Sequence, residues 1–225
     1  MTSSTADNGT VLVTGASRGL GRALADLYAA AGFRVIACMR QGTANALPLD
    51  VADAASIAAL GAALKGEHID IVINNAAIRG DTGGLVSLKT DDFLEVMRIN
   101  ALAPLLIARA LRPNLRAARR PVLVNISSRA GSLAEGTIDD EDGDYAYRCS
   151  KAALNMATVK LAQDFRSDGI AVIALHPGWV RTDMGGAEAA IDVAESAAGL
   201  KALIDATTMA ETGGFRAYDG GAVAW

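Results

Sequence analysis

TVLVTGASRGLG, residues 10–21, joins a short run of threonine, valine and leucine to a turn that contains three glycines. The segment that follows, residues 22–31, has the pattern of a helix, so the order predicts a strand, a glycine turn and a helix. Glycines let a backbone turn tightly and approach a ligand closely, and the free N–H groups at a helix start attract a phosphate. The spacing is G-x-x-x-G-x-G and not G-x-G-x-x-G, which leaves a plain turn between strand and helix open.

Beyond this segment, strand and helix patterns alternate along the chain. Such alternation predicts an α/β fold, with one doubly wound, Rossmann-type domain whose central sheet is mostly parallel and covered by helices on both faces. We expect a flexible tail at residues 1–9 and a single domain over residues 10–225, because no repeat or linker interrupts the pattern. The expected strands cover 32–40, 69–73, 122–126 and 213–218, and the expected helices cover 53–64, 90–115 with an interruption at Pro104, and 193–206.

Composition and charge restrict the class of protein. The chain has 225 residues, 51% of them hydrophobic, and a formal net charge of -4, which argues against nucleic-acid binding. Neither Cys38 and Cys149 nor His68 and His176 have partners at zinc-ligand spacing, so we expect no metal and a reducing compartment. The first residues do not resemble a signal peptide, and no apolar run is long enough for a membrane span, so we expect a cytoplasmic protein without a membrane partner.

Two arginines stand where a dinucleotide cofactor would be selected. The second predicted strand ends in Arg40, about 20 residues beyond the glycines, and Arg18 lies in the glycine turn itself. An acidic residue at the strand end would bind a ribose hydroxyl and select NAD, whereas arginines suit the 2′-phosphate of NADP. We therefore expect NADP(H) in preference to NAD(H), although each arginine could also be a solvated surface charge. Asp50 could contact the adenine or simply cap the helix after it.

Polar residues follow two of the predicted buried strands. The strand at 69–73 ends in Asn74 and Asn75, whose side chains could tie loop backbones together or form a plain Asx turn. The strand at 122–126 ends in Ser127 and Ser128. Either serine could cap the turn, but one hydroxyl there would face the crevice where ligands bind in parallel sheets.

Asn100 lies inside an apolar helical pattern, where a polar side chain needs partners. Pro104 lacks the N–H that would bond to the backbone carbonyl of Asn100. We expect that carbonyl to be free for a water.

Tyr147 and Lys151 are four residues apart at the start of an alanine-rich helix, so their side chains share one face. An ammonium beside a phenol favours the phenolate and would lower the tyrosine pKa from about 10. The pair could then act as a proton donor, although in an arbitrary helix the same spacing would carry no function. Tyr145 is the competing tyrosine, but it points to another face of the helix, so we assign it packing or substrate contact.

Together these motifs resemble the classical short-chain dehydrogenase/reductase family, and His176-Pro177-Gly178-Trp179-Val180 adds the Pro-Gly segment that in this family lies by the nicotinamide. Residues 145–151, residues 178–186 and the end of the chain look most like its C-factor-like carbonyl reductases. The resemblance implies an NADPH-dependent reductase of a ketone or aldehyde that forms a homodimer or homotetramer. It also implies that Tyr147 protonates the substrate oxygen, Lys151 holds the ribose and lowers the pKa of Tyr147, Ser128 binds the developing alkoxide, and Asn100 holds a water of the proton relay. The implied cofactor-binding residues are Gly15, Ser17, Arg18, Gly19, Leu20, Gly21, Arg40, Asp50, Val51, Asn75, Ala76, Tyr147, Lys151, Pro177, Gly178, Val180 and Thr182.

Two departures from the family pattern qualify this expectation. The interval between Ser128 and Tyr147 is long and acidic, which suits a solvated loop or a guard against anionic substrates. The segment after Met184 is short, so we expect an open pocket and broad substrate tolerance. Two other functions remain open, a dinucleotide-binding signalling or redox-sensor protein with little turnover, and an NAD-dependent alcohol dehydrogenase. The acidic residues of the long interval are Glu135, Asp139, Asp140, Glu141, Asp142 and Asp144.

Overall fold

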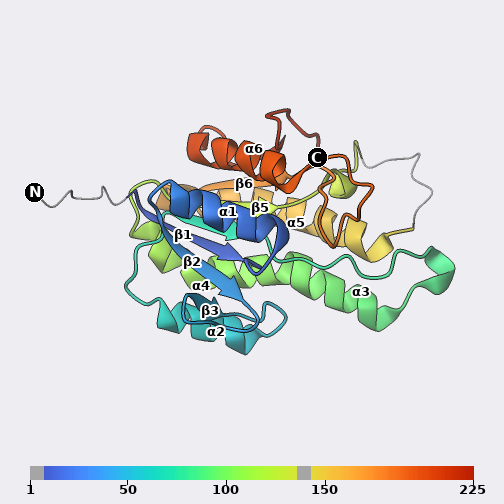
Figure 1. Cartoon of the computed structure of the whole chain (residues 1–225), viewed down its shortest axis with the longest axis horizontal. Helices are drawn as coiled ribbons and strands as arrows, with labels where there is room; N and C mark the ends of the chain where they lie inside the picture. Colours follow the sequence, from blue (N-terminus) through green and yellow to red (C-terminus); the bar gives the residue numbers. More distant parts are fainter. Residues whose placement is uncertain (1–7, 136–142) are drawn as a thin grey trace, which may run out of the picture.

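The computed structural model describes residues 8–135 and 143–225, so most of the predicted tail and part of the acidic interval, Asp139, Asp140, Glu141 and Asp142, lie outside the described residues. Within the described part, seven strands form one parallel sheet in the order β3-β2-β1-β4-β5-β6-β7 (Figure 1). The predicted doubly wound α/β fold is thus confirmed. The strands are β1 (Thr10–Thr14), β2 (Arg34–Met39), β3 (Ala46–Pro48), β4 (Ile71–Asn74), β5 (Val122–Ile126), β6 (Ala171–His176) and β7 (Gly214–Ala217).

Helices cover both faces of the sheet. Helices α1 and α6 pack together on one face, whereas α2, α4 and α5 lie on the other (Figure 1). Parallel strands require such crossover connections, because the chain must return to the same edge of the sheet after every strand. The helices are α1 (Gly19–Ala30), α2 (Ala54–Ala63), α3 (Thr90–Met97), α4 (Ala103–Arg116), α5 (Tyr145–Asp164) and α6 (Val193–Ala206), with short turns η1 (Leu85–Ser87), η2 (Arg98–Leu102), η3 (Arg129–Gly131) and η4 (Arg166–Asp168).

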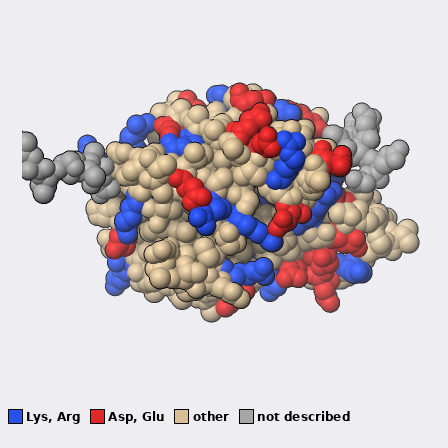
Figure 2. Space-filling view, in the orientation of Figure 1, with Lys and Arg blue, Asp and Glu red and all other residues tan. Residues whose placement is uncertain are grey.

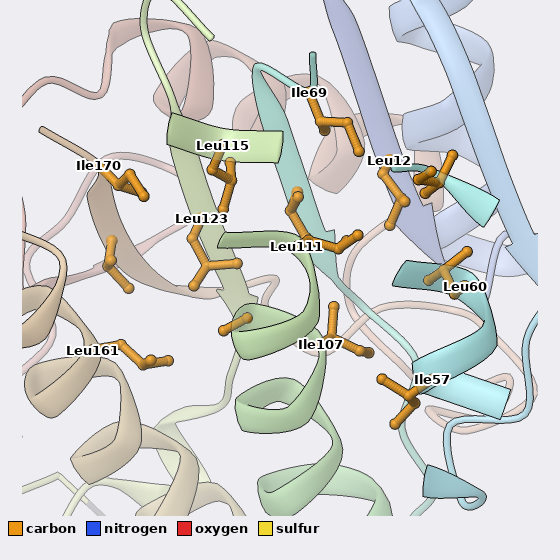
Figure 3. Packing of buried hydrophobic residues seen from close by; sticks show 14 of the residues in the cluster. Leu12, Ile57, Leu60, Ile69, Ile107, Leu111, Leu115, Leu123, Leu161 and Ile170 are labelled. Carbon is orange, nitrogen blue, oxygen red and sulfur yellow. The ribbon is translucent and has the colours of Figure 1, made fainter. Parts of the chain in front are cut away.

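Side chains of successive strand residues enter two different cores. In β1, Leu12 faces the layer of α2 and α4, while Val11 and Val13 face the layer of α1 and α6. Figure 3 shows the first core, where Leu111 of α4 and Leu123 of β5 pack together. Burying one such side chain stabilises the fold by about 1.5–3 kcal/mol, so the fully apolar strands account for the position of the sheet.

The observed elements differ from the predicted ones at three places. Strands β3 and β6 were not predicted. Strand β3 has only three residues and contains Pro48, so its sequence shows no strand pattern. Helix α1 begins at Gly19, inside the glycine turn, rather than at Arg22. The predicted helix over 90–115 is divided by η2, a π-helical turn, which contains Asn100 and ends just before the α4 residues Ala103 and Pro104.

The order of the strands indicates where on the sheet a ligand would bind. The chain runs outward from β1 to β3 and then returns to the other side of β1 with β4, so the loops after β1 and β4 diverge at the carboxyl ends of neighbouring strands. Basic and acidic side chains are interspersed on the face shown in Figure 2. Among the described residues, no helix has both the length and the hydrophobicity that a membrane span requires.

Candidate active site

A cavity of about 1040 Å³ opens at the carboxyl ends of the strands. Its walls come from the loops after β1, β2, β3, β4, β5 and β6, from the first turns of α5, and from single residues of α3 and η2. All seventeen residues expected to bind the cofactor line this cavity, as do Ser128, Tyr147 and Lys151. The fold therefore brings together residues from nearly the whole length of the chain.

The glycine turn and the loop after β4 are packed directly against each other. A Cβ on Gly21 would collide with the side chain of Asn75 and the carbonyl oxygen of Gly15, so only glycine fits. The Asn75 amide donates to the carbonyl oxygen of Thr14 (2.9 Å), and the Thr14 hydroxyl accepts from the backbone N–H groups of Asn75 and Ala76 (both 3.0 Å). Asn75 thus ties two loops together, which is one of the two alternatives that the sequence left open, and the N-terminus of α1 faces the cavity.

The arginines expected to select the cofactor differ in their surroundings. Arg40 lies exposed at the cavity wall beyond β2. Arg18 forms an ion pair with Asp183 of the loop after β6 (2.6 Å), across the cavity, with both side chains more than two thirds exposed. Asp50 also lines the cavity but does not cap α2, because Asp53 is the N-cap residue and accepts from the N–H of Ala55.

The two serines after β5 have different roles. Ser127 is buried, and its hydroxyl donates to Oδ1 of Asn155 on α5 (2.5 Å). Ser128 lines the cavity, accepts from the N–H of Ala130 (3.1 Å), and forms a side-chain hydrogen bond with Tyr147. The serine that faces Tyr147 is therefore the second one, as predicted. Tyr145 is not among the cavity-lining residues, and its side chain is exposed.

Tyr147 and Lys151 lie on the cavity side of α5. The ammonium of Lys151 lies 5.6 Å from the centre of the Tyr147 ring and donates to the carbonyl oxygen of Ile126 (2.8 Å). Burial lowers the pKa of Lys151 to about 8. Burial also raises the pKa of Tyr147, while the hydrogen bond with Ser128 and the charge of Arg79 lower it and Asp144 raises it. The expected net decrease of the Tyr147 pKa is therefore not observed, because desolvation of the phenolate outweighs the nearby positive charge.

Asn100 is buried behind the cavity and does not line it. Its side chain accepts from the N–H of Ile78 (2.9 Å), donates to the carbonyl oxygen of Ile78 (2.8 Å) and donates to the hydroxyl of Ser150 (3.0 Å). The Ser150 hydroxyl in turn donates to the carbonyl oxygen of Tyr147 (2.7 Å). Asn100 thus links the loop after β4 to the first turn of α5, a structural role that the sequence did not indicate.

Arg79, Asp144 and His176 are among the cavity residues that were not predicted as site residues. Arg79 and Asp144 form an ion pair beside Tyr147. His176 lies at the end of β6, and its Nδ1 accepts from the N–H of Arg129 (3.4 Å). Burial and the neighbouring Arg129 lower the pKa of His176 to about 4, so this ring is neutral near pH 7. Of these three residues, only Asp144 had a signal in the sequence, because it belongs to the acidic interval before Tyr147.

The outer part of the cavity has little cover from the segment between β6 and α6. This segment contains turns and a single bridge from Val180 to Ile191, and no helix lies between His176 and Val193. Trp179 lines the cavity, is about half exposed, and donates its ring N–H to the carbonyl oxygen of Gly185 (2.8 Å). The short segment after Met184 thus leaves this side of the cavity open, as expected.

The fold and this arrangement of side chains define a nucleotide-binding oxidoreductase, and comparison with known proteins gives the family. A model of the short chain dehydrogenases matches residues 9–191, so the chain belongs to this family. Among its relatives, the C-signal protein of Myxococcus xanthus is 40% identical over 157 residues, which cover 70% of this chain and 93% of that protein.

Solved structures agree with this assignment. An NADPH-bound carbonyl reductase from chicken fatty liver has a TM-score of 0.90 and 34% identity, covering 97% of this chain and 100% of that chain. A short-chain dehydrogenase/reductase from Brucella ovis, in complex with a partially ordered NAD, has a TM-score of 0.76 and 30% identity, covering 93% and 98%. The protein is therefore a short-chain dehydrogenase with relatives among the carbonyl reductases, as its motifs predicted.

Proposed function

We propose that this protein reduces a ketone or aldehyde to an alcohol with NADPH, and that Tyr147 donates the proton. The observation that carries the proposal is the meeting of Ser128, Tyr147 and Lys151 at one wall of the cavity, next to the glycine turn. Ser128 comes from the loop after β5, whereas Tyr147 and Lys151 come from α5, and a dinucleotide-binding fold without chemistry would not need them side by side.

The cavity fits a nicotinamide dinucleotide. The N-terminus of α1 and the glycines before it offer backbone N–H groups and space for a pyrophosphate, and a Cβ at Gly21 would fill that turn. Arg18 and Arg40 would hold a 2′-phosphate, with Arg18 leaving its ion pair with Asp183. Lys151 would bind the nicotinamide ribose, and Pro177 to Thr182 would border the nicotinamide. When bound, the cofactor supplies the hydride.

The side chains of the protein supply binding and the proton. The Ser128 hydroxyl would hydrogen-bond to the carbonyl oxygen of the substrate and stabilise the negative charge that develops there. Tyr147, protonated near neutral pH because burial raises its pKa, would donate its phenolic proton to that oxygen. Lys151 would stabilise the resulting phenolate until the proton is replaced.

Turnover of a panel of ketones and aldehydes tests the chemistry. Tyr147→Phe should lower kcat/KM by roughly 10²- to 10⁴-fold, since the general acid is lost, while the Kd of NADPH changes little. Tyr145→Phe is the matched control, since Tyr145 lies on the same helix but outside the cavity lining, and should keep full turnover. Turnover that is equal in both variants would contradict the proposal.

Binding of NADPH and NADH, measured by cofactor fluorescence, tests the cofactor preference. We expect tighter binding of NADPH, and Arg40→Asp should reverse the order because an acidic side chain repels the 2′-phosphate and accepts from a ribose hydroxyl. A lower Kd for NADH in the parent protein would instead favour the NAD-dependent alcohol dehydrogenase.

The second candidate function is a signalling or redox-sensor protein, which the similarity to the C-signal protein of Myxococcus xanthus favours. Such a protein would bind the dinucleotide with little turnover. NADPH binding without any Tyr147-dependent turnover across the panel would support this alternative over the reductase.

A further inference from the structure

Arg79 and Asp144 form an ion pair at the wall of the cavity. Nε and Nη2 of Arg79 donate to Oδ1 and Oδ2 of Asp144 at 3.3 and 2.7 Å, so the guanidinium and the carboxylate meet through two parallel hydrogen bonds. The side chain of Asp144 is only 9% exposed. A buried carboxylate held in this way by one arginine has a defined position, unlike a solvated surface pair.

The pair joins the two segments that meet at Tyr147. Arg79 belongs to the loop after β4, whereas Asp144 directly precedes α5 and lies three residues before Tyr147. Asp144 has a left-handed backbone (φ 32°), which is unusual for a residue other than glycine and needs support from its surroundings. Gly143 provides part of that support, because a Cβ there would collide with the backbone of Gly83 and Gly84.

A second link between the same segments lies deeper in the protein. Asn100 binds both backbone groups of Ile78, the neighbour of Arg79, and connects through Ser150 to the carbonyl oxygen of Tyr147. This inner link holds the backbone of the first turn of α5 but brings no charge to the phenol. The outer link, Arg79 with Asp144, places one positive and one negative group beside it.

We propose that Arg79 and Asp144 are positioning residues for Tyr147, which hold the start of α5 against the loop after β4 and balance the charge beside the phenol. The proposal rests on the proposed role of Tyr147 as proton donor. Arg79 favours the phenolate and Asp144 opposes it, so the two charges act in opposite directions on the proton affinity of the phenol.

Other charged or titratable groups near Tyr147 come from every element that packs around it. Most have partners that keep them in place, since Glu95 pairs with Arg98 (3.9 Å) and Arg129 pairs with Glu135 (3.2 Å). Charged or titratable groups that line the cavity beside the pair include Lys151 and Arg148 of α5, Glu95 of α3, Arg129 of η3 and His176 of β6.

The pH profile of alcohol oxidation with NADP⁺ tests the proposal, because the reverse reaction needs the phenolate and its kcat/KM rises with pH up to the pKa of Tyr147. Asp144→Asn should move this profile to lower pH by about 0.5 to 1 unit, since the negative charge that Asp144 places beside the phenol is removed. Arg79→Gln should move it to higher pH by a similar amount, since a buried carboxylate remains beside the phenol. The double variant should return near the parent profile.

A distant ion pair provides the matched control. Nε of Arg112 on α4 lies 2.5 Å from Oδ2 of Asp168 on η4. The side chains of this pair are 42% and 8% exposed, and those of Arg79 and Asp144 are 39% and 9% exposed. Arg112→Gln and Asp168→Asn should lower thermal stability to a similar extent and leave the pH profile in place. Equal losses of activity in Arg79→Gln and Asp144→Asn, with the parent pH profile, would overturn the charge-balancing role.

A titration that needs no turnover separates this proposal from the proposed function. The absorbance of tyrosinate is measured against pH in each variant, with and without Tyr147→Phe, so that the difference reports Tyr147 alone. Opposite displacements of its alkaline onset in Asp144→Asn and Arg79→Gln would support the pair even in a protein without reductase activity. Identical onsets would refute it even in an active reductase.

Discussion

Burial is the largest influence on the pKa of three side chains of the cavity, Tyr147, Lys151 and His176. It raises the pKa of Tyr147, lowers that of Lys151 to about 8, and lowers that of His176 to about 4. Tyr147 therefore stays protonated and His176 neutral near pH 7, while Lys151 titrates within reach of physiological pH. The proposed proton donation requires a protonated Tyr147, and Lys151 would then stabilise the phenolate that remains.

Lys151 makes stability depend on pH in a direction that can be measured. Because its folded pKa, about 8, lies below the usual 10.5, the unfolded chain binds more protons between these values, and stability rises with pH in that window. Relative to Lys151→Met, which keeps the length of the side chain, the parent protein should gain about 2 kcal/mol in unfolding free energy between about pH 7 and about pH 9.5. Urea unfolding at both pH values checks this, and parallel pH dependence in the two proteins would contradict it.

The elements around the cavity are held in register by polar side chains as well as by the apolar cores. Below the site, the amide of Asn74 donates to Oδ1 of Asn125 (2.9 Å), and the amide of Asn125 donates to the hydroxyl of Thr158 (2.9 Å). These buried bonds connect β4, β5 and α5. Asn75 directly follows β4, Ser128 lies in the loop after β5, and Tyr147 belongs to α5. Because buried polar groups are costly when unpaired, such a chain of bonds favours one arrangement of the three elements.

The contact between α1 and the loop after β4 should be sensitive to a single methyl group. Gly21→Ala would push α1 away from Asn75 and Gly15, at a cost of about 1–3 kcal/mol, and should weaken NADPH binding at least tenfold as the helix N-terminus moves. Gly84→Ala is the control, since its Cβ would meet open space. Thermal unfolding and cofactor fluorescence measure the two effects, and unchanged NADPH binding in Gly21→Ala would show that the turn does not hold the phosphates.

The described part of the molecule is a sheet with a large apolar core on each face, and its candidate ligand site lies where the loops of six strands converge. A ligand in that cavity would lie against both halves of the sheet, from the loop after β3 to the loop after β6. Binding should therefore stabilise the protein as a unit and not one loop alone.

NADPH at about 100 times its Kd should raise the unfolding free energy by about 2.7 kcal/mol and the Tm by roughly 5–10 °C, because only the folded chain binds it. NADH at the same concentration should give a smaller shift if the arginines select the 2′-phosphate. Differential scanning calorimetry at several cofactor concentrations measures both, and a Tm independent of NADPH concentration would contradict the predicted site.

Several features of this protein followed from the sequence alone, because they depend on local pattern. The fully apolar strands around Leu12, Val72 and Leu123 predict a buried parallel sheet, and the glycines after β1 predict a phosphate-binding turn. The motifs also led to the expectation that Ser128, Tyr147 and Lys151 lie at one edge of the sheet, where strand ends converge, and these three line one cavity whereas Asn100 does not. The same motifs carry the resemblance to the family, and that resemblance implied Ser128 rather than Ser127.

Only the tertiary structure decided how those side chains are surrounded. The sequence predicted a lowered pKa for Tyr147 from Lys151 alone, whereas the fold buries the phenol and adds Ser128, Arg79 and Asp144 from other segments. Arg79 and Asp144 are 65 positions apart, and no local pattern shows that they meet. Desolvation and pairing depend on every segment that packs around a group, so their balance appears only when the chain has folded.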